Sequence, residues 1–116
     1  MKLYQYPKCS TCRKATKFLN EKGIEFDSID ITEQPPTKLE LQAMLNSYEG
    51  ELRKLFNTSG VQYRELKMKD KLPGMSVEDA LELLAGNGKL IKRPFLLNSN
   101  DKGIVGFKDA DWEAFV

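Results

Sequence analysis

Histidine is absent from this sequence of 116 residues. Its absence excludes Ser–His and Cys–His nucleophile pairs, metal sites with histidine ligands and every acid–base role of an imidazole. An excess of charge of one sign is also missing, because 18 basic residues face 17 acidic ones and the formal net charge is +1. A surface that neutralises the phosphates of a nucleic acid is therefore not expected.

Long apolar runs are missing as well. No stretch approaches the roughly twenty residues of a membrane span, and residues 1–8 lack the apolar core of a secretory signal. The composition, with 41% apolar and 30% charged residues, suits a soluble globular protein. We therefore expect one cytoplasmic domain over residues 1–116, a monomer that binds neither membrane nor nucleic acid directly.

Cysteine is scarce, with Cys9 and Cys12 the only two. In a reducing compartment, a lone nearby pair is more typical of catalysis, redox sensing or metal binding than of a structural disulfide. The search for function therefore begins at this Cys-x-x-Cys motif.

The pattern of apolar residues predicts a strand, a helix and a second strand in the first third of the chain. A short β-prone run over residues 3–6 ends at Pro7, and a helix follows over residues 12–22. Gly23 ends that helix, and residues 24–31 predict a second extended segment. This order is typical of a βαβ unit.

Several short helices are predicted in the middle of the chain. Thr37 and Glu40 form a capping box ahead of a helix. Short amphipathic turns are predicted over residues 52–56 and 63–68, and another helix begins at Ser76. The first helix carries four apolar residues that we assign to the core, Leu39, Leu41, Met44 and Leu45.

The last third of the chain predicts a hairpin and a closing helix. Residues 95–97 and 104–107 flank a loop rich in turn residues, and Asp109 is predicted to cap a final helix over residues 109–116. The complete order predicts an α/β protein with a thioredoxin-like fold, a mixed four-stranded sheet and a helical insertion over residues 37–90.

The motif lies where the first strand gives way to the first helix, so that Cys9 precedes the helix and Cys12 lies in its first turn. Free backbone N–H groups at a helix start stabilise a thiolate, and Lys8 and Arg13 add positive charge. We therefore predict that Cys9 is the nucleophile with a lowered pKa. Cys12 would resolve the adduct to an intramolecular disulfide, and no cofactor is needed.

Two other interpretations of the motif stay open. The cysteines could form half of a zinc site, although the sequence offers no third cysteine and no histidine, so that two chains or carboxylates would have to complete it. They could also be inert buried thiols, which the basic neighbours and the position before a helix disfavour.

A second candidate site element is the segment Arg93-Pro94, just before the predicted hairpin. In a thioredoxin-like fold the residue before a cis-proline at this place faces the nucleophilic cysteine, where an arginine could hold an oxyanion or carboxylate through two hydrogen bonds. The alternative is that Pro94 only opens an edge strand and that Arg93 is solvated.

The sequence resembles the arsenate reductase (ArsC)/Spx family over nearly its whole length. The resemblance rests on residues 6–15, Pro35-Pro36, residues 90–94 and Val105-Gly106-Phe107, in this order and spacing. It implies a thioredoxin-like fold with a helical insertion, a catalytic cysteine at Cys9, and an anion-holding arginine at Arg93 before a cis-proline.

The family has two branches, which imply different activities. Arsenate reductases use one cysteine with glutathione and glutaredoxin, whereas Spx-type regulators use a Cys-x-x-Cys redox switch and bind the RNA polymerase α subunit. This chain has the Cys-x-x-Cys of the Spx branch without the C-terminal segment usual there beyond Val116. The reductases place arginines near Asn57 and Phe107, where this chain has none.

We therefore predict a thiol–disulfide oxidoreductase with catalytic Cys9 and Cys12, and with Arg93, Pro94 and Arg13 as its anion-binding residues. Its reductant would be thioredoxin, glutaredoxin or glutathione, and its reduction of arsenate weak or absent. The alternative is an Spx-type redox-sensing regulator that binds the RNA polymerase α subunit.

Overall fold

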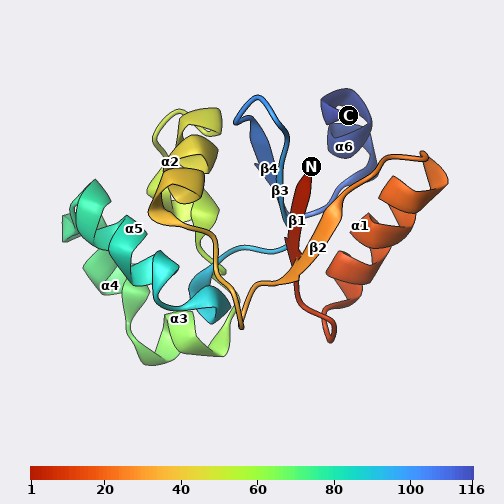
Figure 1. Cartoon of the computed structure of the whole chain (residues 1–116). Coiled ribbons are helices and arrows are strands. Elements are labelled where there is room, and N and C mark those ends of the chain that lie inside the picture. The colour runs from red at the N-terminus through yellow and green to blue at the C-terminus, as the bar shows by residue number, and fades with distance from the viewer.

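The computed structural model describes residues 1–116 and is built on a mixed four-stranded sheet with the strand order β2-β1-β3-β4 (Figure 1). β1 pairs with β2 in parallel and with β3 antiparallel, and β3 pairs antiparallel with β4. The sequence prediction of an α/β protein with a mixed sheet is confirmed. The strands are β1 (Lys2–Gln5), β2 (Asp27–Asp30), β3 (Phe95–Leu97) and β4 (Gly103–Val105).

Six α-helices and three 3₁₀ helices surround this sheet. In Figure 1, α1 and α6 cover one face of the sheet, and the helices between β2 and β3 cover the other. The helices are α1 (Ser10–Glu21), α2 (Lys38–Ser47), η1 (Leu52–Leu55), α3 (Val61–Glu65), α4 (Met68–Lys71), η2 (Leu72–Gly74), α5 (Val77–Ala85), η3 (Gly88–Leu90) and α6 (Asp109–Phe115). None of the helices is both long and apolar enough to cross a membrane.

The sheet is buried on both faces because side chains alternate along each strand. Leu3 of β1 lies opposite Leu96 of β3, and both pack with Trp112 of α6 and the apolar side of α1. Tyr4 and Phe95, the next pair, point to the other face and meet edge to face with their ring centres 5.7 Å apart. Two apolar clusters therefore form, one under each layer of helices.

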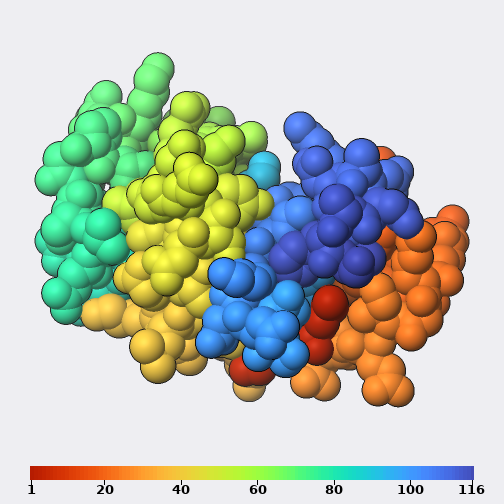
Figure 2. Space-filling view, turned by 90° about the horizontal axis from the view of Figure 1, so that it is seen from above, coloured from red at the N-terminus to blue at the C-terminus, as the bar shows by residue number.

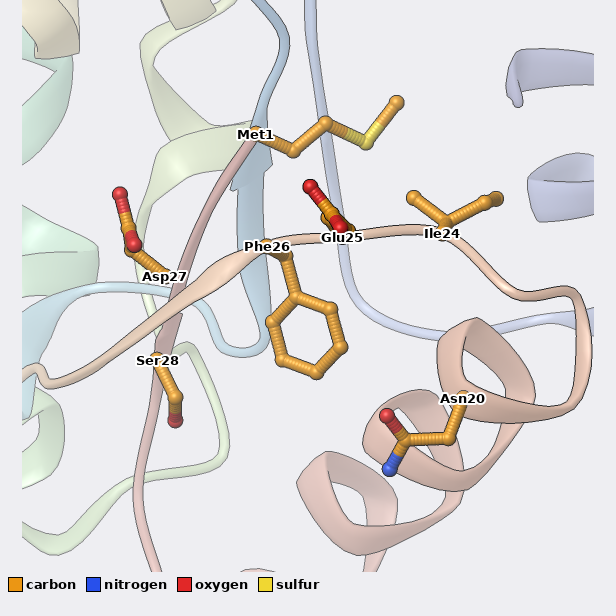
Figure 3. A pocket seen from close by; sticks show the side chains of 7 residues that line it. All are labelled: Met1, Asn20, Ile24, Glu25, Phe26, Asp27 and Ser28. Carbon is orange, nitrogen blue, oxygen red and sulfur yellow. The ribbon is translucent and has the colours of Figure 1, made fainter.

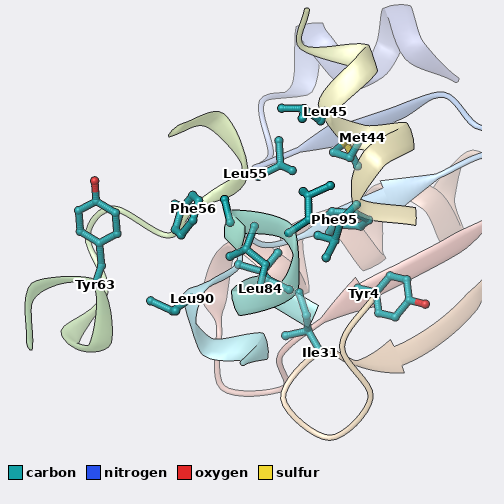
Figure 4. Packing of buried hydrophobic residues seen from close by; sticks show 14 of the residues in the cluster. Tyr4, Ile31, Met44, Leu45, Leu55, Phe56, Tyr63, Leu84, Leu90 and Phe95 are labelled. Atoms are coloured by element: carbon teal, nitrogen blue, oxygen red, sulfur yellow. The ribbon is translucent and has the colours of Figure 1, made fainter. Parts of the chain in front are cut away.

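The larger cluster joins the sheet to the helical segment between β2 and β3. Figure 4 shows Tyr4 and Phe95 of the sheet near Met44 of α2 and Leu84 of α5. Tyr63 of α3 stacks edge to face on Phe56, at 6.1 Å between ring centres. In the space-filling view of Figure 2, this helical segment forms one end of the molecule, and α1 and α6 form the other.

Local signals in the sequence are confirmed where they depend on neighbouring residues. The Thr37–Glu40 capping box is present at the start of α2, and the Ser76 side chain accepts a hydrogen bond from the backbone N–H of Asp79. The hairpin of β3 and β4 is also present. Gly23, with φ of 69°, follows the end of α1 as predicted.

Several predicted boundaries and contacts are wrong. Leu39 was assigned to the core, but it is 85% exposed, because α2 turns this side of the helix outward beside α5. The predicted turn over residues 63–68 is broken by Lys67, whose left-handed φ of 55° separates α3 from α4. α6 is capped by Lys108 rather than Asp109, which is already the first helical residue.

The two outer strands are also shorter than predicted. β2 covers only Asp27–Asp30, because β1 offers it four residues, Lys2–Gln5, as pairing partners. β4 ends before Gly106, whose φ of 69° turns the chain toward α6. The Gly106 carbonyl then accepts a hydrogen bond from the Trp112 indole at 2.7 Å.

Candidate active site at the start of helix α1

Cys9 is the N-cap residue of α1, in the loop that leaves the end of β1. Its backbone is extended, with φ of −96° and ψ of 117°, and its N–H donates to the Tyr6 carbonyl at 3.0 Å. Its sulfur accepts a hydrogen bond from the backbone N–H of Cys12 at 3.3 Å. The sulfur therefore takes the place that a serine or aspartate oxygen occupies in an ordinary N-cap.

The two cysteines have opposite surroundings although they lie within one helical turn. Cys9 is half-buried, whereas Cys12 is fully buried and packs in the layer between α1 and the sheet. Both are free thiols in the structure. An incoming reagent therefore meets the sulfur of Cys9 first.

The surroundings drive the two thiol pKa values apart. Burial raises the pKa of Cys9, but hydrogen bonds from the Cys12 thiol and backbone N–H, together with the Arg93 guanidinium, outweigh it and lower that pKa below its ordinary value. Burial, aided by the hydrogen bond to Cys9, raises the pKa of Cys12 to about 12. Cys9 is therefore the more acidic thiol of the pair, and Cys12 is the less acidic thiol that donates a hydrogen bond to it.

Arg93 reaches Cys9 from a distant part of the chain, the segment between η3 and β3. The Arg93–Pro94 peptide bond is cis. The Arg93 guanidinium carbon lies 4.9 Å from the ring centre of Tyr6, so that the aromatic face supports the cation beside the cysteine loop. Pro94 is buried, and its carbonyl accepts a hydrogen bond from the backbone N–H of Gly106 at 2.9 Å.

Arg13 has a different environment from Arg93. Its side chain is exposed, and its Nη1 donates to the Pro7 carbonyl at 3.0 Å. This hydrogen bond ties the first turn of α1 to the loop that carries Cys9. Arg13 thus braces the loop through Pro7, while Arg93 is the cation that acts on the thiol itself.

A groove of about 350 Å³ begins at Arg93 and runs along α3. We call it the Arg93 groove. The sequence analysis did not assign Gln62, Glu65 or Lys89 to a site, and no local motif would have identified them. The residues that line the groove include Tyr6, Asn57, Gln62, Glu65, Lys89 and Arg93.

The two positions at which the resembled reductases carry arginines have separate surroundings here. Asn57 lines the Arg93 groove. Phe107 instead packs between Phe18 of α1 and Trp112 of α6, with ring centres 5.6 and 5.1 Å away. The Phe107 position therefore serves the packing of α6 on α1, and only Asn57 faces the groove.

A wide cleft lies away from the cysteines. It has a volume of about 750 Å³ and is lined by Met1 before β1, Asn20 near the end of α1 and residues 24–28 (Figure 3). Cys9 follows the opposite ends of the same elements, since it comes after β1 and before α1. The cleft contains neither a thiol nor an arginine, so the chemistry of the cysteine pair takes place elsewhere.

No group of three or more cysteine or carboxylate side chains is brought together in a geometry that could hold a metal ion. A zinc site built on Cys9 and Cys12 would therefore need ligands from a second chain.

Comparison with known sequences gives a family for this architecture. The model of the ArsC family matches residues 4–115. The chain is 54% identical over 110 residues to Uncharacterized protein YusI of Bacillus subtilis, covering 95% of this chain and 92% of that protein. It is 32% identical over 115 residues to the Global transcriptional regulator Spx of Enterococcus faecalis, covering 98% and 84% of the two chains.

Comparison with solved structures gives the same result. The chain is similar to the crystal structure of "a possible arsenate reductase" from Streptococcus mutans UA159, with a TM-score of 0.90 and 41% identity over 99% of this chain and 97% of that one. The predicted thioredoxin-like fold and the predicted family resemblance are therefore confirmed.

Proposed function

Because the chain belongs to the ArsC family, we propose that it is a thiol–disulfide oxidoreductase whose reactive groups are Cys9 and Cys12. The proposal rests on the different burial and pKa of the two cysteines. Cys9 is half-buried with a lowered pKa, and Cys12 is buried one turn along the same helix with a raised pKa. A low-pKa, accessible thiol beside a protected second thiol is the arrangement of a nucleophile and its resolving partner.

The proposed reaction has two steps. The Cys9 thiolate attacks one sulfur of a substrate disulfide, the substrate S–S bond breaks, and one substrate thiolate leaves while Cys9 is held in a mixed disulfide. Cys12 then loses its proton to solvent and attacks the Cys9 sulfur, which releases the second substrate thiolate. The protein pair gives up two electrons and becomes a disulfide, and the substrate disulfide is reduced to two thiols.

The raised pKa of Cys12 suits this order of events. Before the first step, Cys12 is a neutral thiol that donates a hydrogen bond to the Cys9 thiolate. Burial is the main cause of the raised pKa of Cys12, and the hydrogen bond and charge of Cys9 add to it. Once Cys9 is bound in a mixed disulfide, its negative charge is gone and this added part is removed, so that Cys12 loses its proton more readily after the first step than before it.

The basic residues have distinct proposed roles. Arg93 stabilises the Cys9 thiolate and holds an anionic group of the substrate, and the buried Pro94 fixes the backbone on which Arg93 is mounted. Arg13 positions the Cys9 loop through its hydrogen bond to the Pro7 carbonyl. A cytosolic thiol reductant such as thioredoxin, glutaredoxin or glutathione would return the oxidised pair to two thiols.

Redox titration followed by peptide mapping tests the proposal. In buffers of graded reduced and oxidised glutathione, the wild-type chain should form the Cys9–Cys12 disulfide reversibly. The Cys12→Ser variant should instead accumulate one glutathione on Cys9, because the resolving thiol is gone. Failure of the pair to oxidise at any glutathione ratio, or preferential modification of Cys12, would remove the basis of the proposal.

The similarity to Spx favours a second candidate, a redox-sensing regulator that binds the RNA polymerase α subunit. In this case the Cys9–Cys12 disulfide is a switch rather than a catalytic intermediate. The immobilised chain, oxidised or reduced, would be mixed with purified α subunit. Redox-dependent retention supports the regulator, and turnover of a disulfide substrate without retention supports the enzyme.

A further inference from the structure

The Arg93 groove carries an arrangement of charges that the proposed reaction does not yet use. Two cations line it, Arg93 and Lys89, together with the amides of Asn57 and Gln62 and one carboxylate, Glu65. These residues come from three separate segments, the loop after η1, helix α3, and η3 with the segment that follows it. Only the folded chain assembles the groove.

Arg93 connects the groove to the reactive sulfur. Its guanidinium lines the groove and also acts on the Cys9 thiol, whereas Cys9 itself does not line the groove. A ligand whose sulfur meets Cys9 therefore extends past Arg93 into the groove. Because Arg93 is shared between Cys9 and the ligand, the second cation of the groove is Lys89, which makes no ion pair in the structure.

The side-chain amides that line the groove favour a ligand that accepts hydrogen bonds. The side-chain oxygen of Gln62 is occupied by a hydrogen bond from the Asn87 amide nitrogen. This contact leaves the NH₂ group of Gln62 as the part that can donate to a ligand. The groove therefore offers the ammonium group of Lys89 and the neutral NH₂ group of Gln62, and both can donate hydrogen bonds to a carboxylate.

The charged side chains of the groove indicate the charge of the ligand that the groove can bind. Lys89 and Arg93 contribute two positive charges to the groove, and Glu65 contributes one negative charge. This net charge of +1 matches a singly charged anion, whereas a doubly charged anion such as phosphate would leave one negative charge unmatched. A single carboxylate next to Lys89, separated from Cys9 by Arg93, fits it better.

We propose that the Arg93 groove is a carboxylate-binding subsite with Lys89 as its anchor, and that the substrate is a thiol or disulfide that carries a carboxylate near its sulfur. This inference rests on the proposed thiol–disulfide function and adds the class of its substrate. Lys89 is then a specificity-determining residue, since it contacts the substrate but neither sulfur.

Two disulfide reagents separate binding in the groove from the reactivity of Cys9. The probe 5,5′-dithiobis(2-nitrobenzoate) carries one carboxylate on each ring, and 4,4′-dithiodipyridine is uncharged at pH 7.5. Both react with a thiolate by the same exchange, in which the probe S–S bond breaks, a mixed disulfide forms on Cys9 and one thiolate leaves. The carboxylated leaving group stays a yellow thiolate, and the pyridine leaving group takes up a proton and absorbs in the ultraviolet as the thione. Stopped-flow rates measured in the Cys12→Ser background report this single step.

Lys89→Gln should lower the rate constant with the carboxylated probe by about three- to tenfold and leave that with the uncharged probe within about twofold. Glu65→Gln should change the carboxylated rate in the opposite direction, because it removes the groove's only carboxylate. Lys14→Gln is the matched control, since Lys14 is an exposed lysine of α1 that does not line the groove. It should leave the ratio of the two rates unchanged.

The outcomes are distinguishable. If Lys89→Gln slows both probes equally, Lys89 acts on the Cys9 thiolate and the subsite is refuted. If Lys14→Gln lowers the ratio as much as Lys89→Gln, general surface charge explains the preference and the subsite is again refuted. If neither probe reacts with Cys9, the proposed function itself fails, and this inference fails with it.

Discussion

The backbone N–H of Cys12 donates a hydrogen bond to the sulfur of Cys9 over 3.3 Å. This contact makes Cys9 the N-cap of the helix that carries Cys12. The partial positive charge at the start of a helix therefore acts on the Cys9 sulfur, where it favours the thiolate form. The same helix carries Cys12 in a fully buried position, which raises the pKa of its thiol.

Removing the arginine beside Cys9 should reduce thiolate formation. Arg93→Gln takes away a positive charge that favours the charged form, so the pKa of Cys9 rises and its titration curve moves to higher pH. The rate of iodoacetamide alkylation at pH 6 should fall by about three- to tenfold. Absorbance of the thiolate at 240 nm against pH measures the change. Arg53→Gln removes a positive charge at an exposed position of η1 and is the charge-matched control. Equal thiolate titration curves for the two variants would place Arg93 outside the site.

Arsenate should be a poor substrate. Stabilising a multiply charged oxyanion in the transition state calls for several convergent cationic donors. Beside Cys9 the chain has Arg93, whereas Asn57 offers a neutral amide and Phe107 packs between Phe18 and Trp112. A coupled assay with arsenate, glutathione and glutaredoxin, or with thioredoxin, measures this directly. Turnover of roughly one per second or more would refute the expectation.

The same argument predicts a gain of function. Asn57→Arg would bring a second guanidinium into the groove that Arg93 lines. We expect the variant to reduce arsenate faster than the wild-type chain, by about tenfold, because each added charge-assisted contact stabilises the oxyanion. Asn46→Arg, at an exposed position of α2 outside the groove, is the control for the added charge. Equal rates for the two variants would show that cation number in the groove does not limit the reaction.

Gly88 should tolerate no side chain. A Cβ at this position would lie 1.8 Å from the backbone oxygen of Ile31, which the chain can relieve only by moving η3 away from the end of β2. Gly88→Ala should lower the free energy of unfolding by about 2–4 kcal/mol. Gly74→Ala is the control, since no atom lies within 4 Å of its added Cβ, and it should stay within about 1 kcal/mol. Urea denaturation compares the two variants, and similar urea midpoints would contradict the close approach of Gly88 to the backbone of Ile31.

Glu40 should make the fold sensitive to acid. Burial raises the pKa of Glu40, but hydrogen bonds from the Thr37 backbone, the Tyr4 hydroxyl at 2.7 Å and Lys2 outweigh it and lower that pKa below its ordinary value of 4.5. A group with a lowered folded-state pKa adds stability above its unfolded pKa and loses it as the pH falls through the folded one. Glu40 therefore stabilises the fold at neutral pH, and this stabilisation is lost progressively as the pH falls below 4.5 and through the lowered folded-state pKa.

The Tyr4→Phe variant isolates this contribution. At pH 7 it should unfold about 1–2 kcal/mol more easily than the wild-type chain, because Glu40 loses a charge-assisted hydrogen bond in a largely buried place. The difference should shrink as the pH falls below 4.5 and through the lowered folded-state pKa of Glu40, because Glu40 then becomes protonated in both proteins. Tyr63→Phe serves as the control. If the difference in the free energy of unfolding between Tyr4→Phe and the wild-type chain stays constant with pH, Glu40 is not the source of that difference.

The sequence by itself determined the features that depend on residues close together in the chain. Three features follow from side chains and backbone groups within one turn of a helix: the N-caps at Thr37 and Ser76, the end of α1 at Gly23, and the position of Cys9 at a helix start. The alternation of strands and helices followed from hydrophobic periodicity, which is also local. The α/β class and the place of Cys9 at a helix start were therefore predictable.

Only the tertiary structure decided what meets Cys9 and what lines the groove beside it. Periodicity shows which face of a helix is apolar, but it does not show which neighbour covers that face, and so Leu39 was assigned to the core although it is exposed. Arg93 was suggested through the inferred fold, whereas Lys89, Gln62 and Glu65 carried no local signal. These side chains come together because the sheet pairing and the packing of α3 against η3 fix them in space, and such contacts depend on residues far apart in the sequence.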